Sequence, residues 1–176
     1  DRLKRIPKYM CPNVYRRCDR LPLNKNGKID RQLLKALIHK SPVPIQGVDE
    51  LPRGMGAYYD NEQKIIFVRR GMEAHDIFRS LSKELAHAEL ALSSPEYSRE
   101  SAGFAAYSVS YVVCKRYGVD VSAYDFSALP DSIRDADPQT VRAALNEISE
   151  TAKDITGRMN RALEQVKAPR AKEQER

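Results

Sequence analysis

The feature that most constrains the fold is a helical pattern between Glu73 and Leu92. Apolar residues recur there at spacings of three and four, which places them in one stripe along a helix: Phe78, Leu81, Leu85, Ala88 and Leu92. Because side chains of a helix repeat with a period of 3.6, Lys83 and His87 lie together on another side, with Glu84 between the two faces. The pattern predicts a helix that buries one face and turns Lys83-Glu84-Leu85-Ala86-His87 toward a different neighbour.

Two further helices are predicted after this one. Residues 98–117 are apolar and small nearly all round, which predicts a central buried helix that ends at Gly118 and has Glu100 in its first turn. Asp137-Pro138 is typical of a helix start, and the helix should continue to about Val166. Its apolar residues predict a packing seam against other helices or a partner chain: Val141, Leu145, Ile148, Ala152, Ile155, Met159, Leu163 and Val166.

A β-hairpin is predicted ahead of the first helix. Residues 57–60 and 64–69 are rich in aromatic and β-branched residues and are separated by the polar turn sequence 60–63. Gly71 ends the hairpin. Residues 41–55 form a Pro- and Gly-containing connector with an extended stretch at 43–48, and residues 119–137 should lie over the core as a loop. These elements predict an α+β fold, with a small hairpin or sheet packed on a helical bundle.

The positive charge of the chain is concentrated at its beginning. The net charge is +6, but residues 1–40 carry 12 Lys and Arg against 3 Asp and Glu, a balance of +9, which leaves 18 against 21 in the rest. A basic segment next to a mildly acidic body indicates contact with a polyanion, either nucleic acid or a protein partner. The candidate contact residues are Arg2, Lys4, Arg5, Lys8, Arg16, Arg17, Arg20, Lys25 and Lys28.

Composition excludes several other classes of protein. The cysteines Cys11, Cys18 and Cys114 form no C-x-x-C pair, which favours free thiols over a disulfide framework or a cysteine zinc site. No stretch approaches the roughly 18 apolar residues of a membrane span, so we expect no membrane contact and a cytoplasmic location. The chain begins at Asp1 rather than at methionine, so we expect either a piece of a longer protein or a chain that has lost its start.

The predicted organisation has four parts. Residues 1–40 form the basic N-terminal segment, with a short hairpin and a helix near 30–39, and residues 41–55 form the connector. Residues 56–166 form the main domain, and residues 167–176 form a charged tail expected to be disordered.

Residues 6–31 carry two short motifs in order, P-x-Y-M-x-P from Pro7 and L-P-L-x-x-N-G-K-I-D-R from Leu21. They resemble the C-terminal end of adenylate-forming enzymes, and the resemblance implies that Lys28 occupies the position of a catalytic lysine. The nucleotide-binding body of such enzymes precedes this motif. We therefore expect a small subdomain or a remnant of a fusion rather than adenylation by this chain.

The main domain carries a second resemblance. A hairpin is followed by a helix with the sequence E-L-A-H at 84–87, then by Glu100 with Phe104-Ala105, and then by Y-G-V-D at 117–120. This order resembles the ImmA/IrrE family of minimal zinc metallopeptidases, and more closely the peptidase-like domains embedded in multidomain proteins of plasmids and conjugative elements. The resemblance implies a minimal zincin-like fold.

The resemblance also implies roles for individual residues. His87 and Glu100 would be metal ligands, and Glu84 would be the general base for an attacking water. Lys83 stands where the family has its first histidine ligand, and a protonated amine repels Zn²⁺. His75 and His39 lack the spacing to replace that histidine. An ion pair between Lys83 and Glu100 would substitute for the metal charge.

These observations favour a catalytically degenerate metallopeptidase-like domain that acts as an interaction or scaffold module of a bacterial mobile-element protein. We expect no cofactor and a protein partner. Two alternatives stay open: an active zinc peptidase with unusual ligands, and a nucleic-acid-binding or anti-defence protein that uses the basic N-terminal segment.

Overall fold

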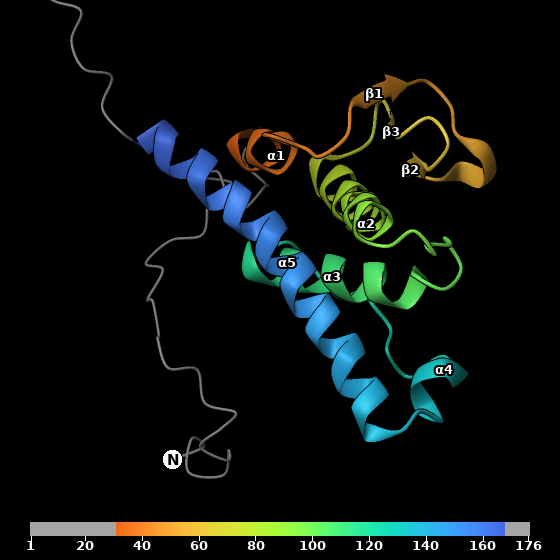
Figure 1. Cartoon of the computed structure of the whole chain (residues 1–176). Coiled ribbons are helices and arrows are strands. Elements are labelled where there is room, and N and C mark those ends of the chain that lie inside the picture. Colours follow the sequence, from red (N-terminus) through yellow and green to blue (C-terminus); the bar gives the residue numbers. More distant parts are fainter. Residues whose placement is uncertain (1–30, 168–176) are drawn as a thin grey trace, which may run out of the picture.

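The computed structural model describes residues 31–167, which form an α+β fold with a three-stranded sheet on one side of a group of helices (Figure 1). The predicted charged tail at 168–176 and the predicted hairpin and basic residues before Arg31 lie outside the described residues. The predicted α+β class is confirmed.

The sheet contains one strand more than the predicted hairpin. Strands β2 (Ala57–Asp60) and β3 (Ile65–Arg69) form the antiparallel hairpin, with Tyr59 opposite Ile66. Strand β1 (Ile45–Val48) pairs in parallel with β3, giving the order β1-β3-β2. β1 lies within the predicted connector, whose extended stretch therefore belongs to the sheet.

The central helix is α2 (Ala74–Ser93), and it has the sheet on one side and the other helices around the rest. The predicted apolar stripe is buried at Phe78, Leu81, Leu85 and Ala88, whereas Leu92 is 54% exposed at the helix end. α2 contacts β2 and β3 through one face and α3 (Gly103–Arg116) through another. Residues on two sides of α2 are therefore covered by protein, including Glu84 and His87.

The long helix α5 (Pro138–Lys167) crosses α3 and also packs on α1 (Arg31–Ile38) (Figure 1). Asp137 caps α5 by accepting hydrogen bonds from the backbone N–H groups of Gln139 and Thr140, at 2.8 and 3.1 Å. The predicted seam is buried from Ile148 to Met159, but Leu145 is 57% exposed. The C-terminal half of the seam on α5 therefore packs against other helices of this chain.

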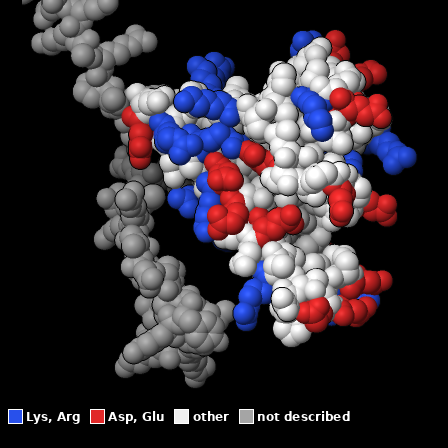
Figure 2. All heavy atoms as spheres, in the orientation of Figure 1, with Lys and Arg blue, Asp and Glu red and all other residues white. Residues whose placement is uncertain are grey.

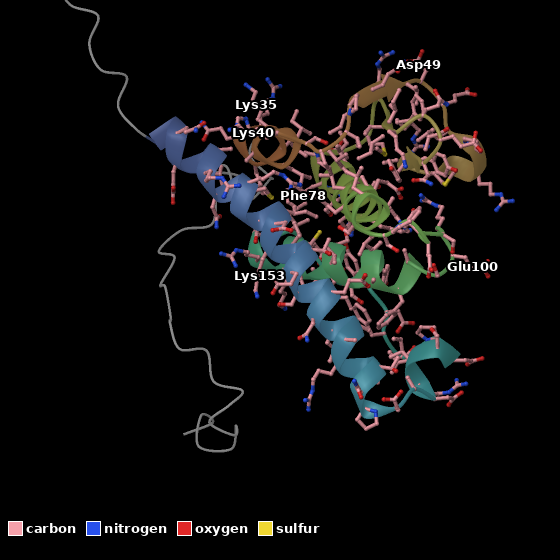
Figure 3. The ribbon with its side chains drawn as sticks, viewed as in Figure 1. Lys35, Lys40, Asp49, Phe78, Glu100 and Lys153 are labelled. Atoms are coloured by element: carbon pink, nitrogen blue, oxygen red, sulfur yellow. The ribbon has the colours of Figure 1, made fainter. Side chains whose placement is uncertain are left out.

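One hydrophobic core includes α1 as well as the later elements. Leu33, Ala36 and Leu37 of α1 are buried in the same cluster as Phe78 of α2 and Ile155 of α5. Phe78 lies in the interior near α5 in Figure 3, whereas Lys35 and Lys40 extend from the outer side of the α1 region. Helix α1, at the end of the predicted basic segment, therefore packs into the same hydrophobic core as α2 and α5.

Helix α3 begins later than the sequence predicts. It starts at Gly103 rather than near Ser98, because residues 98–102 form turns in which Ser98 bonds to the backbone and side chain of Ser101. Its end is as predicted, since Gly118 has a φ of +68°, in the left-handed region. A short helix, α4 (Asp131–Arg134), precedes α5. Among residues 31–167, no helix has both the length and the apolar character needed to span a membrane.

Candidate functional site

The predicted motif residues of α2 have different surroundings. Glu84 and His87 are 3% and 1% exposed, whereas Lys83 is half-buried. The helix brings them together because they are neighbours or four residues apart, which places them within about one turn. Glu84 and His87 are thus inside the protein rather than in solvent. Their hydrogen-bond partners therefore determine their roles.

Both carboxylate oxygens of Glu84 accept hydrogen bonds from protein groups. The backbone N–H of Tyr59 donates to Oε2 at 2.8 Å, and Nη2 of Arg99 donates to Oε1 at 2.8 Å. The Arg99 guanidinium also lies over the ring of Tyr58, with 4.6 Å between Cζ and the ring centroid. A buried carboxylate with a cation and a backbone donor is a structural ion pair that joins α2, β2 and the turn before α3.

His87 is held in its neutral form. Its Nδ1 and the hydroxyl of Tyr97 are 3.0 Å apart in a hydrogen bond, and the two rings pack edge to face. Burial, together with the positive charges of Arg99 and Lys83, lowers the pKa of His87 to about 3. Burial likewise raises the pKa of Tyr97 to about 12, so the phenol keeps its proton.

Lys83 and His87 line a pocket of about 550 Å³ between α2, the start of α3 and residues 128–130. The lining also includes one more cation, Arg99, and two aromatic residues, Phe104 and Tyr107. A smaller pocket of about 210 Å³ shares Lys83 and Tyr107 and extends toward Arg79 and Tyr124. The predicted motif therefore borders an open hollow, and Lys83 and Arg99 are the cations that line it.

An aromatic cluster fixes the wall of this pocket. Tyr107 and Tyr111 of α3 contact the rings of Tyr124 and Phe126 from the loop after the helix, at centroid distances of 5.0 to 5.5 Å. Tyr107 Oη also accepts a hydrogen bond from the backbone N–H of Asp125 at 2.7 Å. The loop that was predicted to lie over the core therefore follows α3, and it carries residues 128–130 to the rim of the pocket.

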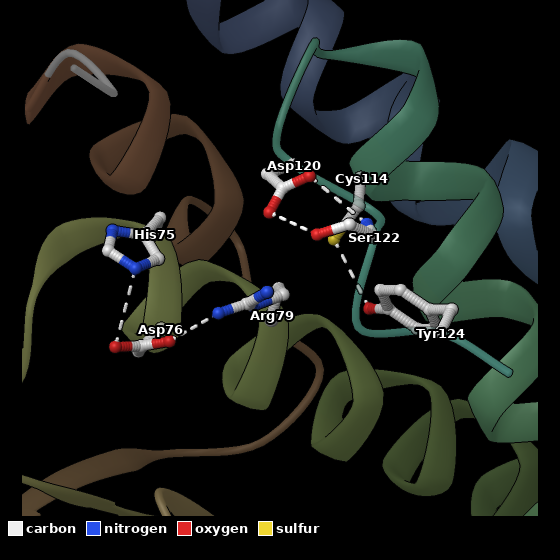
Figure 4. Close-up of polar contacts among 7 residues, drawn as sticks. All are labelled: His75, Asp76, Arg79, Cys114, Asp120, Ser122 and Tyr124. Atoms are coloured by element: carbon white, nitrogen blue, oxygen red, sulfur yellow. Dashed lines mark hydrogen bonds and ion pairs between the residues drawn. The ribbon is translucent and has the colours of Figure 1, made fainter.

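Tyr124 also anchors this loop to buried polar groups. Its hydroxyl is 2.6 Å from Oγ of Ser110. The same hydroxyl is 3.4 Å from Sγ of Cys114 (Figure 4). Burial raises the pKa of the Cys114 thiol, and the thiol is free and buried. Cys114 is therefore a packing residue with little thiolate character. Cys11 and Cys18 lie outside the described residues.

The other predicted ligand does not join the motif. Glu100 is exposed in the turn between α2 and α3, at the edge of the molecule (Figure 3). The predicted ion pair between Lys83 and Glu100 is wrong, because the ion pair in this region joins Glu84 to Arg99. The reason is the late start of α3, which leaves Glu100 in a turn and brings Arg99 inward instead.

The other histidines are also elsewhere. His75 lies at the start of α2, where Nε2 is 3.5 Å from a carboxylate oxygen of Asp76 (Figure 4), and His39 follows α1. Within residues 31–167, no group of three or more His, Cys, Asp and Glu side chains could hold a metal ion. A catalytic zinc needs three protein ligands, so the described residues do not fit one.

Sequence reasoning missed three residues that define the site: Arg99, Tyr97 and Tyr59. Two follow the Ser94-Pro95 break after α2, in a segment that has no periodicity. The sequence held one signal for Arg99. A glutamate that becomes buried, such as Glu84, requires a cation as its partner, and Arg99 directly precedes the predicted ligand Glu100. The nine basic candidates, from Arg2 to Lys28, lie outside the described residues.

Comparisons with known proteins give only short matches. No protein family model matches the chain, and no solved structure matches it. A malformin synthetase of Aspergillus tubingensis is 38% identical over 53 residues, which is 30% of this chain and 1% of the synthetase. A hybrid PKS-NRPS synthetase of Emericella nidulans is 49% identical over 41 residues, 23% of this chain and 1% of that protein. The chain thus spans about 1% of the length of the curated relatives it matches.

Proposed function

We propose that the chain contains a metallopeptidase-like domain that does not hydrolyse peptides and instead acts as a binding module. The observation that carries this proposal is the occupation of both oxygens of Glu84 by protein donors, one from Tyr59 and one from Arg99. A general base must have an oxygen that a water molecule can reach, and Glu84 does not line the pocket beside Lys83. Glu84 is 3% exposed and already paired, so its carboxylate serves the fold.

The surroundings of Lys83 support the same proposal. A cation at this position opposes metal binding, and Arg99 adds a second positive charge beside His87. A site that has lost its metal ligands but keeps a pocket is suited to hold a ligand without changing it. By its resemblance to domains of plasmid and conjugative-element proteins, we place this module in a bacterial mobile-element protein with a protein partner.

Metal analysis of the purified chain tests the proposal. After incubation with equimolar zinc and desalting, the wild-type chain should retain far less than one zinc per chain and should cleave no polypeptide. Near-stoichiometric zinc, together with cleavage that Glu84→Gln abolishes, would overturn the proposal.

The variant Lys83→His tests the ancestry separately, because it restores the two-histidine spacing of the family at positions 83 and 87. It should retain more zinc than the wild type. The matched control is Lys115→His, which places a histidine on the exposed side of α3. Equal zinc retention by the two variants would count against the resemblance to metallopeptidases.

A second candidate function is nucleic-acid binding by the basic segment. Figure 2 shows Lys and Arg side chains gathered over α1 and the adjoining part of α5, and Arg31, Lys35 and Lys40 of this region are exposed. Binding through phosphate contacts should weaken steeply with salt, because such contacts release counterions. A fluorescent DNA duplex titrated at two salt concentrations measures this, and a flat salt response would count against it.

The short matches to synthetases support a narrower proposal about origin. We infer that these matches, over 53 and 41 residues, include residues 6–31, where the chain resembles the C-terminal end of adenylate-forming enzymes. Under this proposal the segment is a remnant joined to the metallopeptidase-like domain, and the activity of the synthetases does not extend to this chain.

A further inference from the structure

We propose that the pocket beside Lys83 binds a carboxylate attached to an aromatic or branched aliphatic group. This inference rests on the proposed function, because it takes the hollow to be a binding site rather than a hydrolytic one. It goes further by stating the chemical class of the ligand. Three properties of the pocket lead to it: its charge, its apolar walls and its size.

The charge of the pocket favours a ligand with one negative charge. Lys83 and Arg99 are the cations of the lining, and no aspartate or glutamate lines it. Glu84 balances Arg99 from beneath, whereas no ion pair to Lys83 is present among residues 31–167. His87 is neutral and adds no charge. One positive charge is therefore uncompensated, which suits a monoanion such as a carboxylate better than a phosphate dianion.

The walls favour an apolar group next to that carboxylate. Phe104 and Tyr107 of α3 form one side, and Leu129 and Pro130 form the other. Leu129 is 41% exposed, so a ligand between these walls would remove apolar surface from water. The few polar groups of a mostly apolar hollow fix the orientation of a ligand, which here would turn its carboxylate toward Lys83.

The size of the pocket fits a compact ligand. A volume of about 550 Å³ lies within the range of roughly 300 to 1,000 Å³ typical of small-molecule sites. Two sources offer the same chemistry: a free small carboxylic acid, and the C-terminal residue of a polypeptide. In both, a carboxylate is attached to the carbon that carries the apolar group.

A binding experiment with matched ligands tests the proposal on the full chain. N-acetyl-L-phenylalanine and its uncharged amide are titrated in separate samples, and backbone amide shifts are followed by NMR with EDTA present. The acid should bind and shift the amides of Lys83, His87 and Phe104, and the amide ligand should bind at least about tenfold more weakly because it lacks the charge. Equal binding of the two ligands, or shifts confined to other parts of the chain, would overturn the proposal.

Variants of Lys83 show whether its charge is the recognition group. Lys83→Met should weaken binding of the acid at least about tenfold, and Lys83→Arg should retain most of it. Lys115→Met, which removes an exposed lysine of α3, should bind like the wild type. Unchanged binding by Lys83→Met would contradict the assignment of Lys83.

A pentapeptide that ends in phenylalanine, with a free or an amidated C-terminus, distinguishes the two sources. Preference for the free peptide acid over N-acetyl-L-phenylalanine assigns a polypeptide end, and the reverse assigns a small molecule. Because EDTA removes metal, these results do not depend on zinc. Zinc-dependent cleavage would refute the proposed function alone, whereas absence of binding by every acid would refute the pocket proposal alone.

Discussion

At the scale of single residues, Glu84 is the position where the metallopeptidase resemblance and the structure make opposite predictions. In a catalytic role, replacing the carboxylate by an amide removes activity and leaves stability almost unchanged. In this chain the carboxylate is 3% exposed and paired with Arg99, whose side chain is 34% exposed. The effect of Glu84→Gln on stability therefore distinguishes a catalytic role of Glu84 from a structural one.

We predict that Glu84→Gln lowers the free energy of unfolding by about 1 to 3 kcal/mol, because it leaves a partly buried guanidinium without its counter-charge. The estimate is below that of a fully buried pair, since solvent screens Arg99. Urea unfolding measures the change. Glu150→Gln, which disrupts the exposed pair with Lys153, is the control and should change stability far less. A fully stable Glu84→Gln variant would contradict the structural role.

His87 makes stability depend on pH. Its pKa is about 3 in the folded chain and about 6.5 when unfolded, so between these values the unfolded state binds the extra proton. Stability from the neutral ring is complete above the unfolded pKa and declines as the pH falls toward 3. We predict a loss of about 2 kcal/mol between pH 7 and pH 5, which urea unfolding at the two values measures.

The variant His87→Gln removes the titrating ring and should reduce this pH dependence, although it costs stability at pH 7. His75→Gln is the control, because that side chain is 48% exposed and lies outside the core. If His87→Gln shows the same decline as the wild type between pH 7 and pH 5, groups other than His87 cause it.

At the scale of elements, the loop of residues 119–130 is held by its aromatic residues. Phe126 contacts Phe104, Tyr107 and Tyr111 on α3, although the loop has no regular secondary structure. We predict that Phe126→Ala lowers the free energy of unfolding by about 1 to 2 kcal/mol, less than for a fully buried ring. It should also speed hydrogen exchange of the Asp125 amide, which donates to Tyr107.

Leu129→Ala is the matched control for this prediction, because Leu129 belongs to the same loop but is 41% exposed. It should have little effect on stability or on exchange at Asp125. Similar effects of the two substitutions would mean that the ring contacts do not fix the loop.

Elements with regular periodicity could be predicted from the sequence. The hairpin, α2 and α5 were predicted within one residue at most ends, because burial on one face leaves a repeating pattern. The start of α3 was not predicted, because the Ser98 to Ala102 turn is set by hydrogen bonds of serine side chains. The parallel pairing of β1 with β3 was also missed, since it depends on contacts between distant segments.

At the scale of the whole molecule, the candidate site also combines residues from one periodic helix with residues from distant segments. The sequence identified Lys83, Glu84 and His87 because they lie on one predicted helix. Tyr97 and the amide of Tyr59 left no such signal in the sequence, and the one signal for Arg99 was its place next to Glu100; all three reach that helix from other segments. The role of a motif residue depends on these partners, so the motif alone indicated a metal centre where the structure has an ion pair.

The amide of Tyr59 also limits how this protein can associate with others. β2 is at the edge of the sheet, and edge strands commonly recruit a strand from another chain through their unpaired N–H and C=O groups. At Tyr59 that hydrogen bond is already made, because Glu84 accepts the outward N–H. Strand addition along β2 would require Glu84 to leave its place and Arg99 to lose its counter-charge. Self-association and partner recruitment by strand pairing are therefore disfavoured at this edge.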